Sequence, residues 1–171
     1  MAMGKHRRIL QVVGYQNSGK TTLIEKLIQR LSESGLETAV IKHHGHGGAP
    51  ELGASSKDST RTFEAGAVVS GVEGNGVLQL AARVSEWSLE KWLDFYAFFP
   101  VDVLLVEGYK KEDYPKVVLV RSAENWEELR DLTNIQCVIS VEPLNDGRGG
   151  IPVYTREQEA EYMEYLMESL L

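Results

Sequence analysis

The sequence predicts an α/β protein, a three-layer sandwich in which helices cover both faces of a mostly parallel sheet and an antiparallel hairpin is added. Short β-branched segments alternate with longer segments whose apolar residues recur at helical spacing, which is typical of parallel strands joined by helices. The segment 101–106 (VDVLLV) is almost continuously apolar, as expected of a central strand buried on both faces. Gly74-Asn75-Gly76 lies between two short β-rich segments and predicts the hairpin.

The N-terminal half of the chain predicts two parallel strands, two helices and the hairpin. A buried-strand segment over 8–13 is followed by a helical stripe over 20–34, which Gly35 ends, and by a β-branched strand over 37–42. Residues 43–57 show no periodicity and predict a long loop. The remaining elements of this half are a short helix over 58–65 and hairpin strands over 67–72 and 77–80.

The C-terminal half predicts three strands and three helices. Apolar, β-branched runs predict the strands, and apolar residues three and four apart predict the helices. Thr155 and Gln158 fit a capping box at the start of the last helix, and Cys137 lies within the last strand, where we expect a small core residue. The elements are strands over 101–106, 116–120 and 135–140 and helices over 88–98, 124–130 and 155–171.

Composition limits the classes of protein and of site. With 171 residues, 43% of them apolar, the chain is long enough for one domain over 1–171 with its own core. Its single cysteine excludes an internal disulfide. No apolar run approaches the ~18 residues of a membrane span, and no signal peptide is recognisable, so we expect a cytoplasmic protein. The net charge of −7 disfavours nucleic-acid binding, although residues 1–30 carry +5, which suits a phosphate site.

Residues 14–21 (GYQNSGKT) match the P-loop pattern G-x-x-x-x-G-K-[ST] between a predicted strand and a predicted helix, as the motif requires. Two glycines allow a backbone shape whose amides surround an anion, next to the positive end of the helix dipole. Lys20 would reach the β and γ phosphates, which makes it the first candidate catalytic residue. The predicted nucleotide-binding residues are Gly14, Tyr15, Gln16, Asn17, Ser18, Gly19, Lys20, Thr21 and Thr22.

A P-loop needs a second oxygen ligand for Mg²⁺, and Glu107 ends the buried strand at the edge of the sheet where ligands bind. We therefore predict Thr21 and Glu107 as the metal ligands, whereas Asp102, at the other end of that strand, reads as structural. A solvated strand end is the alternative for Glu107. No N-K-x-D segment is present, so the motifs alone do not distinguish GTP from ATP.

Three histidines lie together in Lys42-His43-His44-Gly45-His46. The first interpretation is a metal site, although their spacing is unlike that of common zinc pairs. The second is contact of Lys42, His43 and His46 with phosphate, nucleotide or an anionic substrate. A polar loop is the third. Downstream, Asp58 is a candidate catalytic residue acting through metal-bound water and Arg61 a candidate phosphate ligand, while an exposed ion pair three residues apart is the simpler alternative.

Five segments in chain order resemble the molybdopterin-guanine dinucleotide biosynthesis protein B (MobB) family over residues 8–142: GYQNSGKTTLIEKLI, IKHHGH, DSTRTFEAGA, VDVLLVEGYK and PKVVLVR. The resemblance implies a P-loop protein that binds GTP, hydrolyses it weakly and forms homodimers. It also implies partnership with the molybdenum cofactor guanylyltransferase, and it allows a molybdopterin-type ligand. Carried over by position, the matching residues beyond the P-loop are Lys42, His43, His46, Asp58, Arg61 and Glu107.

The sequence as a whole leads to a GTP-binding accessory protein of molybdenum cofactor biosynthesis, with weak GTPase activity and Mg²⁺. His44 departs from the acidic residue expected in many family members, so no metal role is assigned to it. Two alternatives stay open: a P-loop small-molecule kinase or ligase similar to dethiobiotin synthetase, and a non-enzymatic scaffold for pterin delivery. The span 67–80 contains one charged residue, Glu73, and we expect this region to contribute to a homodimer.

Overall fold

The computed structural model describes residues 8–43, 57–144 and 150–171. Contacts between residues divide the chain into two units. The larger unit comprises residues 1–45 and 93–171, and the smaller unit comprises residues 46–92. None of the helices in the described ranges combines the length and apolar character that a membrane crossing requires.

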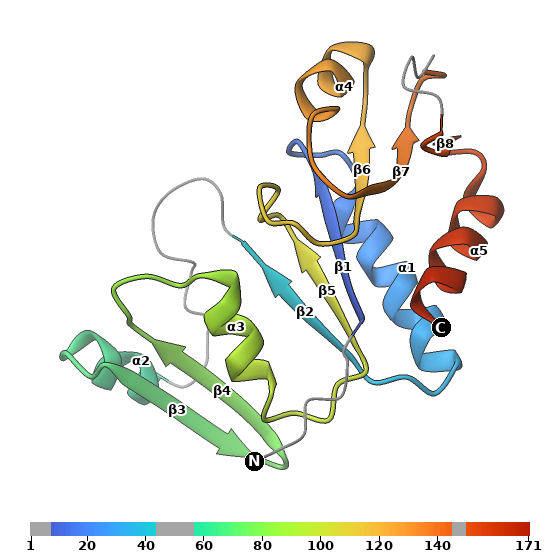
Figure 1. Cartoon of the computed structure of the whole chain (residues 1–171). Helices are drawn as coiled ribbons and strands as arrows, with labels where there is room; N and C mark the ends of the chain where they lie inside the picture. The colour runs from blue at the N-terminus through green and yellow to red at the C-terminus, as the bar shows by residue number, and fades with distance from the viewer. Residues whose placement is uncertain (1–7, 44–56, 145–149) are drawn as a thin grey trace. The chain divides into compact units, whose positions relative to one another are not determined.

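A six-stranded sheet with the order β2-β5-β1-β6-β7-β8 forms the centre of the larger unit (Figure 1). Every neighbouring pair in it is parallel. The parallel sheet predicted from the alternation of strands and helices is therefore confirmed. Its strands are β1 (Arg8–Gly14), β2 (Thr38–Lys42), β5 (Val103–Glu107), β6 (Lys116–Val120), β7 (Ile135–Ser140) and β8 (Val153–Thr155).

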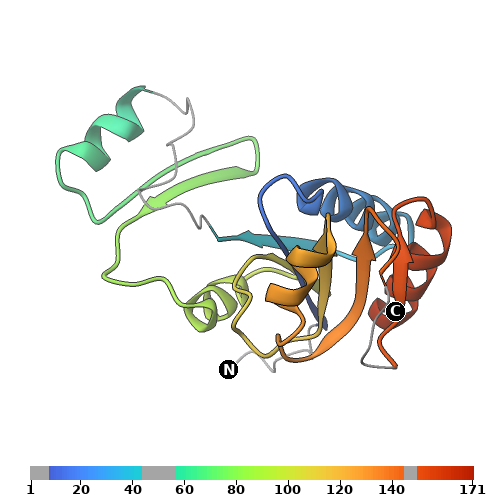
Figure 2. The ribbon, with the colours of Figure 1, turned by 90° about the horizontal axis from the view of Figure 1, so that it is seen from above.

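Helices cover both faces of this sheet, as predicted. On one face, α1 (Lys20–Glu33) and α5 (Glu159–Leu170) pack on residues of β1, β5, β6 and β7. On the other face, α4 (Ala123–Leu129) packs through Trp126 and Leu129 onto β1, β6 and β7. Figure 2 shows the sheet between these two layers. All residues of β5 and β6 are buried, which is why the sequences of these strands, apart from Glu107 and Lys116, are apolar rather than alternating.

Cys137 is fully buried in the first of these two cores, as expected of a small core residue. Burial raises the pKa of its thiol to about 12. Asp102 is structural, because its Oδ2 accepts a 3.0 Å hydrogen bond from the backbone N–H of Glu37 and so ties the start of β2 to the start of β5.

The C-terminal end of the chain differs from the prediction. Residues 153–155 form the short edge strand β8, and the last helix begins at Glu159 rather than at Thr155. Gln158 does reach back as a capping box requires, because its Oε1 accepts a 2.9 Å hydrogen bond from the Thr155 N–H. A turn at Arg156 and Glu157 separates the two elements. A three-residue strand is too short to produce a recognisable pattern. The sequence therefore predicts only the helix, and it places the start of that helix at Thr155.

The smaller unit contains α2 (Lys57–Glu64) and the predicted hairpin of β3 (Val69–Gly74) and β4 (Val77–Ala82). The strands pair antiparallel, and Asn75 and Gly76 take positive φ angles of 50° and 78° at the turn. Arg83 joins hairpin and helix, because its Nη1 donates to the Phe63 carbonyl and its guanidinium lies 3.8 Å from the Phe63 ring centroid. The helix α3 (Leu89–Tyr96) follows in sequence.

Candidate functional site

The P-loop joins the C-terminal end of β1 to the start of α1 and has the backbone shape that its glycines allow. Gly14 has φ of 154°, and a Cβ there would lie 2.4 Å from the Leu119 carbonyl oxygen of the neighbouring strand. Asn17 and Gly19 are left-handed, with φ of 59° and 87°. Left-handed residues in such a succession are typical of an anion-binding nest, in which backbone amides face a bound anion. Gly14 therefore cannot be replaced without moving the sheet.

The start of α1 carries positive charge. Gly19 is its N-cap and supplies no side-chain hydrogen bond, and the first turn of α1 contains no acidic residue. Lys20 extends across the loop, where its Nζ donates a 2.7 Å hydrogen bond to the Tyr15 carbonyl. Partial burial lowers the pKa of Lys20, while the nearby Glu107 carboxylate opposes that shift. Helix dipole, uncapped amides and ammonium group together favour a bound anion here.

Glu107 lies at the same edge of the sheet, next to Thr21. Its Oε2 accepts a 3.3 Å hydrogen bond from the Thr21 hydroxyl and lies 3.4 Å from Nζ of Lys42. Glu107 as a whole residue is 8% exposed, so it is not a freely solvated strand end. Strand register explains the meeting, because Glu107 is paired with Val12 on one side and Lys42 on the other. A hydroxyl and a carboxylate are hard oxygen donors of the kind that Mg²⁺ prefers, so this pair fits that ion.

Substitution of Glu107 by glutamine tests this pair. The isosteric amide keeps the volume and removes the charge, so we expect the enhancement of nucleotide binding by Mg²⁺ to fall about tenfold, while binding without metal changes little. Calorimetric titration with and without Mg²⁺ measures both quantities. The control is Glu112→Gln, which removes an exposed carboxylate from the loop after β5. Equal Mg²⁺ enhancement in wild type and Glu107→Gln would remove Glu107 from the metal site.

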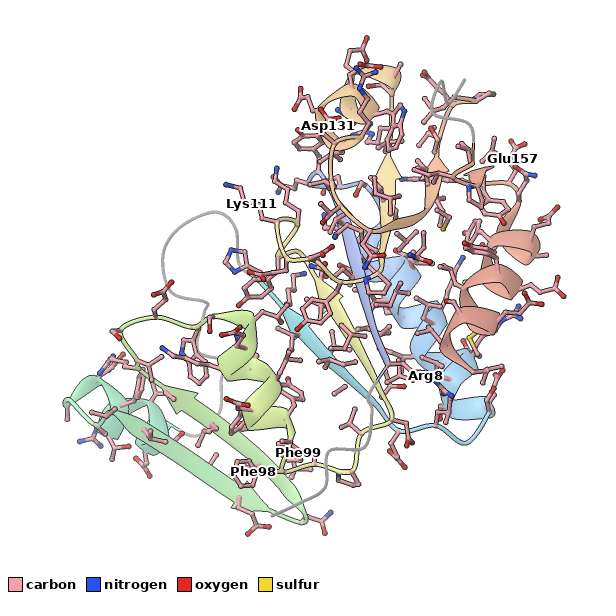
Figure 3. The ribbon with its side chains drawn as sticks, in the orientation of Figure 1. Arg8, Phe98, Phe99, Lys111, Asp131 and Glu157 are labelled. Atoms are coloured by element: carbon pink, nitrogen blue, oxygen red, sulfur yellow. The ribbon has the colours of Figure 1, made fainter. Side chains whose placement is uncertain are left out.

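Aromatic and basic residues of the loop after β5 lie beside the P-loop. Gly108 and Tyr109 both have positive φ, and this turn brings the Tyr109 ring to 4.6 Å from the His43 ring, between centroids. Lys110 Nζ lies 5.8 Å from the centre of the Tyr15 ring. Figure 3 shows Lys111 projecting from the same loop. His43 and Lys42 therefore share an edge of the sheet with the P-loop, whereas His44 and His46 fall outside the described residues.

Two buried polar residues that sequence reasoning did not select hold this loop in place. Gln11, on β1, donates from Nε2 to the carbonyls of Gly108 and Tyr109 at 3.2 and 2.8 Å. Lys116, the first residue of β6, is completely buried. Its Nζ donates three hydrogen bonds of 2.6–3.0 Å, to the carbonyls of Glu112, Tyr114 and Thr133. Gln11, inside an apolar strand pattern, was the one local signal, whereas Lys116 stands at the start of its strand and gave none.

Two contacts brace the P-loop from outside. The Tyr15 hydroxyl hydrogen-bonds Glu128 on α4, and Arg156, after β8, donates to the Ser18 carbonyl. Ser18 itself is buried, and no described residue partners its hydroxyl oxygen. Neither Glu128 nor Arg156 belongs to a recognisable motif, because each reaches the loop only through the tertiary fold.

Asp58 and Arg61 belong to α2 of the smaller unit. Their side chains are 89% and 80% exposed, and Arg61 Nη1 lies 3.8 Å from Asp58 Oδ1. They thus form the exposed ion pair that their spacing predicts. Their suggested roles toward water and phosphate stay predictions.

Known proteins with a similar sequence identify the family of this chain. The family model described as "Molybdopterin guanine dinucleotide synthesis protein B" (MobB) matches residues 9–141. The chain belongs to the MobB family. A Bacillus subtilis relative, a probable molybdopterin-guanine dinucleotide biosynthesis adapter protein, is 44% identical over 90% of this chain and 88% of its own.

Further family members support the assignment. The Escherichia coli adapter protein of the same description is 32% identical over 80% of each chain. The crystal structure of Bacillus subtilis MobB superposes with a TM-score of 0.84, at 40% identity, over 96% of this chain and 98% of that one. Family and fold predicted from the sequence are therefore both confirmed.

Proposed function

We propose that this protein is a GTP-binding adapter of molybdopterin-guanine dinucleotide biosynthesis, with weak GTPase activity. The observation that carries the nucleotide part is the P-loop with the Thr21–Glu107 pair at its mouth. The pathway comes from the relatives, which are described as adapter proteins of that biosynthesis. Guanine in the name of their product favours GTP over ATP, which the motifs leave open.

The chemistry follows from the charges at the loop. Lys20 and the loop amides would stabilise negative charge that develops on the γ-phosphoryl group during transfer to water. Thr21 and Glu107 would hold Mg²⁺, which neutralises phosphate charge when bound. Glu107 already pairs with Lys42, and in the described part of the larger unit no second carboxylate accompanies it at Thr21. Within the described residues of the larger unit we find no group placed to position the attacking water, and Asp58 of the smaller unit stays the candidate, which supports slow hydrolysis.

The adapter role predicts dependence on the partner enzyme. We expect the molybdenum cofactor guanylyltransferase to raise the GTP hydrolysis rate of this protein at least about tenfold, or about 1.4 kcal/mol in activation free energy. Single-turnover hydrolysis with and without the partner measures this, and Lys20→Ala gives the background. Stimulation by a small metabolite instead of the partner would favour a kinase or ligase. Unimpaired dinucleotide synthesis with Lys20→Ala would favour a scaffold that needs no nucleotide.

A homodimer built partly from the hairpin belongs to the same proposal. Within the described residues each hairpin strand has one paired edge, and the exposed apolar residues of the two strands are Val69, Val77, Leu78 and Leu80. Pairing with a second copy would satisfy the open edges and cover this surface. We expect a dimer by light scattering at micromolar concentration, weakened by Leu78→Lys and not by Val141→Lys, an exposed valine outside the hairpin. A wild-type monomer would contradict this expectation.

A further inference from the structure

Arg156 provides a cation to the P-loop from the C-terminal part of the chain. It lies in the turn between β8 and α5, next to Glu157, which is labelled in Figure 3. Its Nη2 donates a 2.7 Å hydrogen bond to the Ser18 carbonyl, from 138 residues away in sequence. A Cβ on Gly19 would stand 3.4 Å from the same nitrogen. The guanidinium therefore lies directly against the peptide that joins Ser18 to Gly19.

The turn that carries Arg156 is attached to the sheet. β8 pairs with β7 in a register that places Thr155 opposite Ser140. The Arg156 backbone N–H then donates a 2.9 Å hydrogen bond to the Ser140 carbonyl. The sheet thus defines the position of the Arg156 backbone, and its side chain spans from there to the P-loop. Because of this attachment, the contact with Ser18 is a property of the fold and not of a loose side chain alone.

The contact determines which way the Gly19 amide points. A peptide unit is planar and trans, so its carbonyl and its N–H point in opposite directions. The described chain contains no cis peptide. Because the Ser18 carbonyl points toward Arg156, the Gly19 N–H points away from it. In the described ranges, no backbone carbonyl accepts a hydrogen bond from this N–H.

The charge on the guanidinium strengthens the same amide as a donor. A hydrogen bond from a charged donor is stronger than one between neutral groups, and it polarises the peptide whose oxygen accepts it. We propose that Arg156 is a positioning residue of the nucleotide site, which orients and polarises the Ser18–Gly19 peptide so that the Gly19 N–H donates to a phosphate oxygen. This inference rests on the proposed function, because it assumes that the loop binds a nucleotide.

Nucleotide affinity gives the first test, with Arg8 as a matched control. The Arg8 guanidinium also donates to a backbone carbonyl, that of Leu170 at 2.8 Å, but at the opposite end of the sheet (Figure 3). We expect Arg156→Gln to weaken GTP binding about tenfold, Arg156→Lys to weaken it less because the charge remains, and Arg8→Gln to change it less than about twofold. Equal affinities of wild type and Arg156→Gln, or equal losses in Arg156→Gln and Arg8→Gln, would overturn the proposal while leaving GTP binding established.

The second test needs no nucleotide. In ¹H–¹⁵N spectra of the nucleotide-free protein, loss of the polarising cation should move the Gly19 amide proton upfield in Arg156→Gln and leave it in place in Arg8→Gln. If the wild-type protein binds no GTP, the proposed function fails. The Gly19 chemical shift still tests whether Arg156 orients and polarises the Ser18–Gly19 peptide. An unmoved Gly19 resonance in Arg156→Gln would then overturn the role of Arg156.

Discussion

Replacing Lys20 with alanine is expected to weaken Mg·GTP binding at least about a hundredfold without unfolding the protein. The ammonium group lies across the loop on the Tyr15 carbonyl, within the cradle that the phosphates would enter. Its loss removes charge-assisted hydrogen bonds to two phosphates, each of which contributes substantially in a partly desolvated site. Thr21→Ala should have a similar effect on the Mg²⁺-dependent part of binding, because it removes a hydroxyl ligand.

Calorimetric titration measures these affinities, and circular dichroism establishes that each variant is folded. Lys26→Ala is the matched control, because Lys26 belongs to the same helix but its Nζ pairs with Glu159 on α5. We expect its GTP affinity to stay within about twofold of wild type, since an exposed ion pair contributes little. Unchanged affinity in a folded Lys20→Ala protein would contradict the assignment of the loop.

Replacing Lys116 with alanine is expected to lower the free energy of unfolding by about 3 kcal/mol, which is large for a single substitution. The buried ammonium donates to three backbone carbonyls, and its removal leaves all three without that donor. The hydrogen bonds are partly buried, so losing each costs roughly 1 kcal/mol, and the cavity left by the buried side chain adds to the loss. The same substitution would release the loop that carries Tyr109 and Lys110 beside the P-loop.

Chemical denaturation gives this free energy, and two further variants separate its causes. Lys116→Met fills most of the volume without donating, so it should recover only the part of the loss that the cavity causes. Lys110→Ala removes an exposed lysine from the same loop and should change stability by less than about 0.5 kcal/mol. A loss below about 1 kcal/mol in Lys116→Ala would show that the three carbonyls do not depend on this side chain.

The parts of the site that the sequence predicts are those set by neighbouring residues or by the end of a strand. Gly14 to Thr21 form one continuous segment from the end of β1 to the start of α1, so the motif contains most of the information about its shape. Glu107 was recognisable because a buried parallel strand must end at the edge of the sheet that binds ligands. The meeting of Thr21 with Glu107 then follows from the parallel pairing of β1 with β5.

The missed residues act through contacts that no local pattern records. Arg156 reaches Ser18 only because β8 pairs with β7, and β8 is too short to be predicted. Lys116 stands at the first position of a strand, where a lysine normally reads as solvent-exposed. It is buried because its ammonium donates to the carbonyls of Glu112 and Tyr114, in the loop before β6, and of Thr133, just before β7. For Asp58 and Arg61 the local pattern is sufficient, because their spacing of three residues predicts the ion pair that they form.

The central claim is that the P-loop and the Thr21–Glu107 pair bind a guanine nucleotide with Mg²⁺. Separate calorimetric titrations of GTP and ATP into the wild-type protein, each with and without Mg²⁺, test it most directly. We expect GTP to bind, to bind more tightly than ATP, and to bind more tightly in the presence of Mg²⁺ than without it. Absence of heat with both nucleotides in a folded protein, or GTP binding that Mg²⁺ does not change, would contradict it.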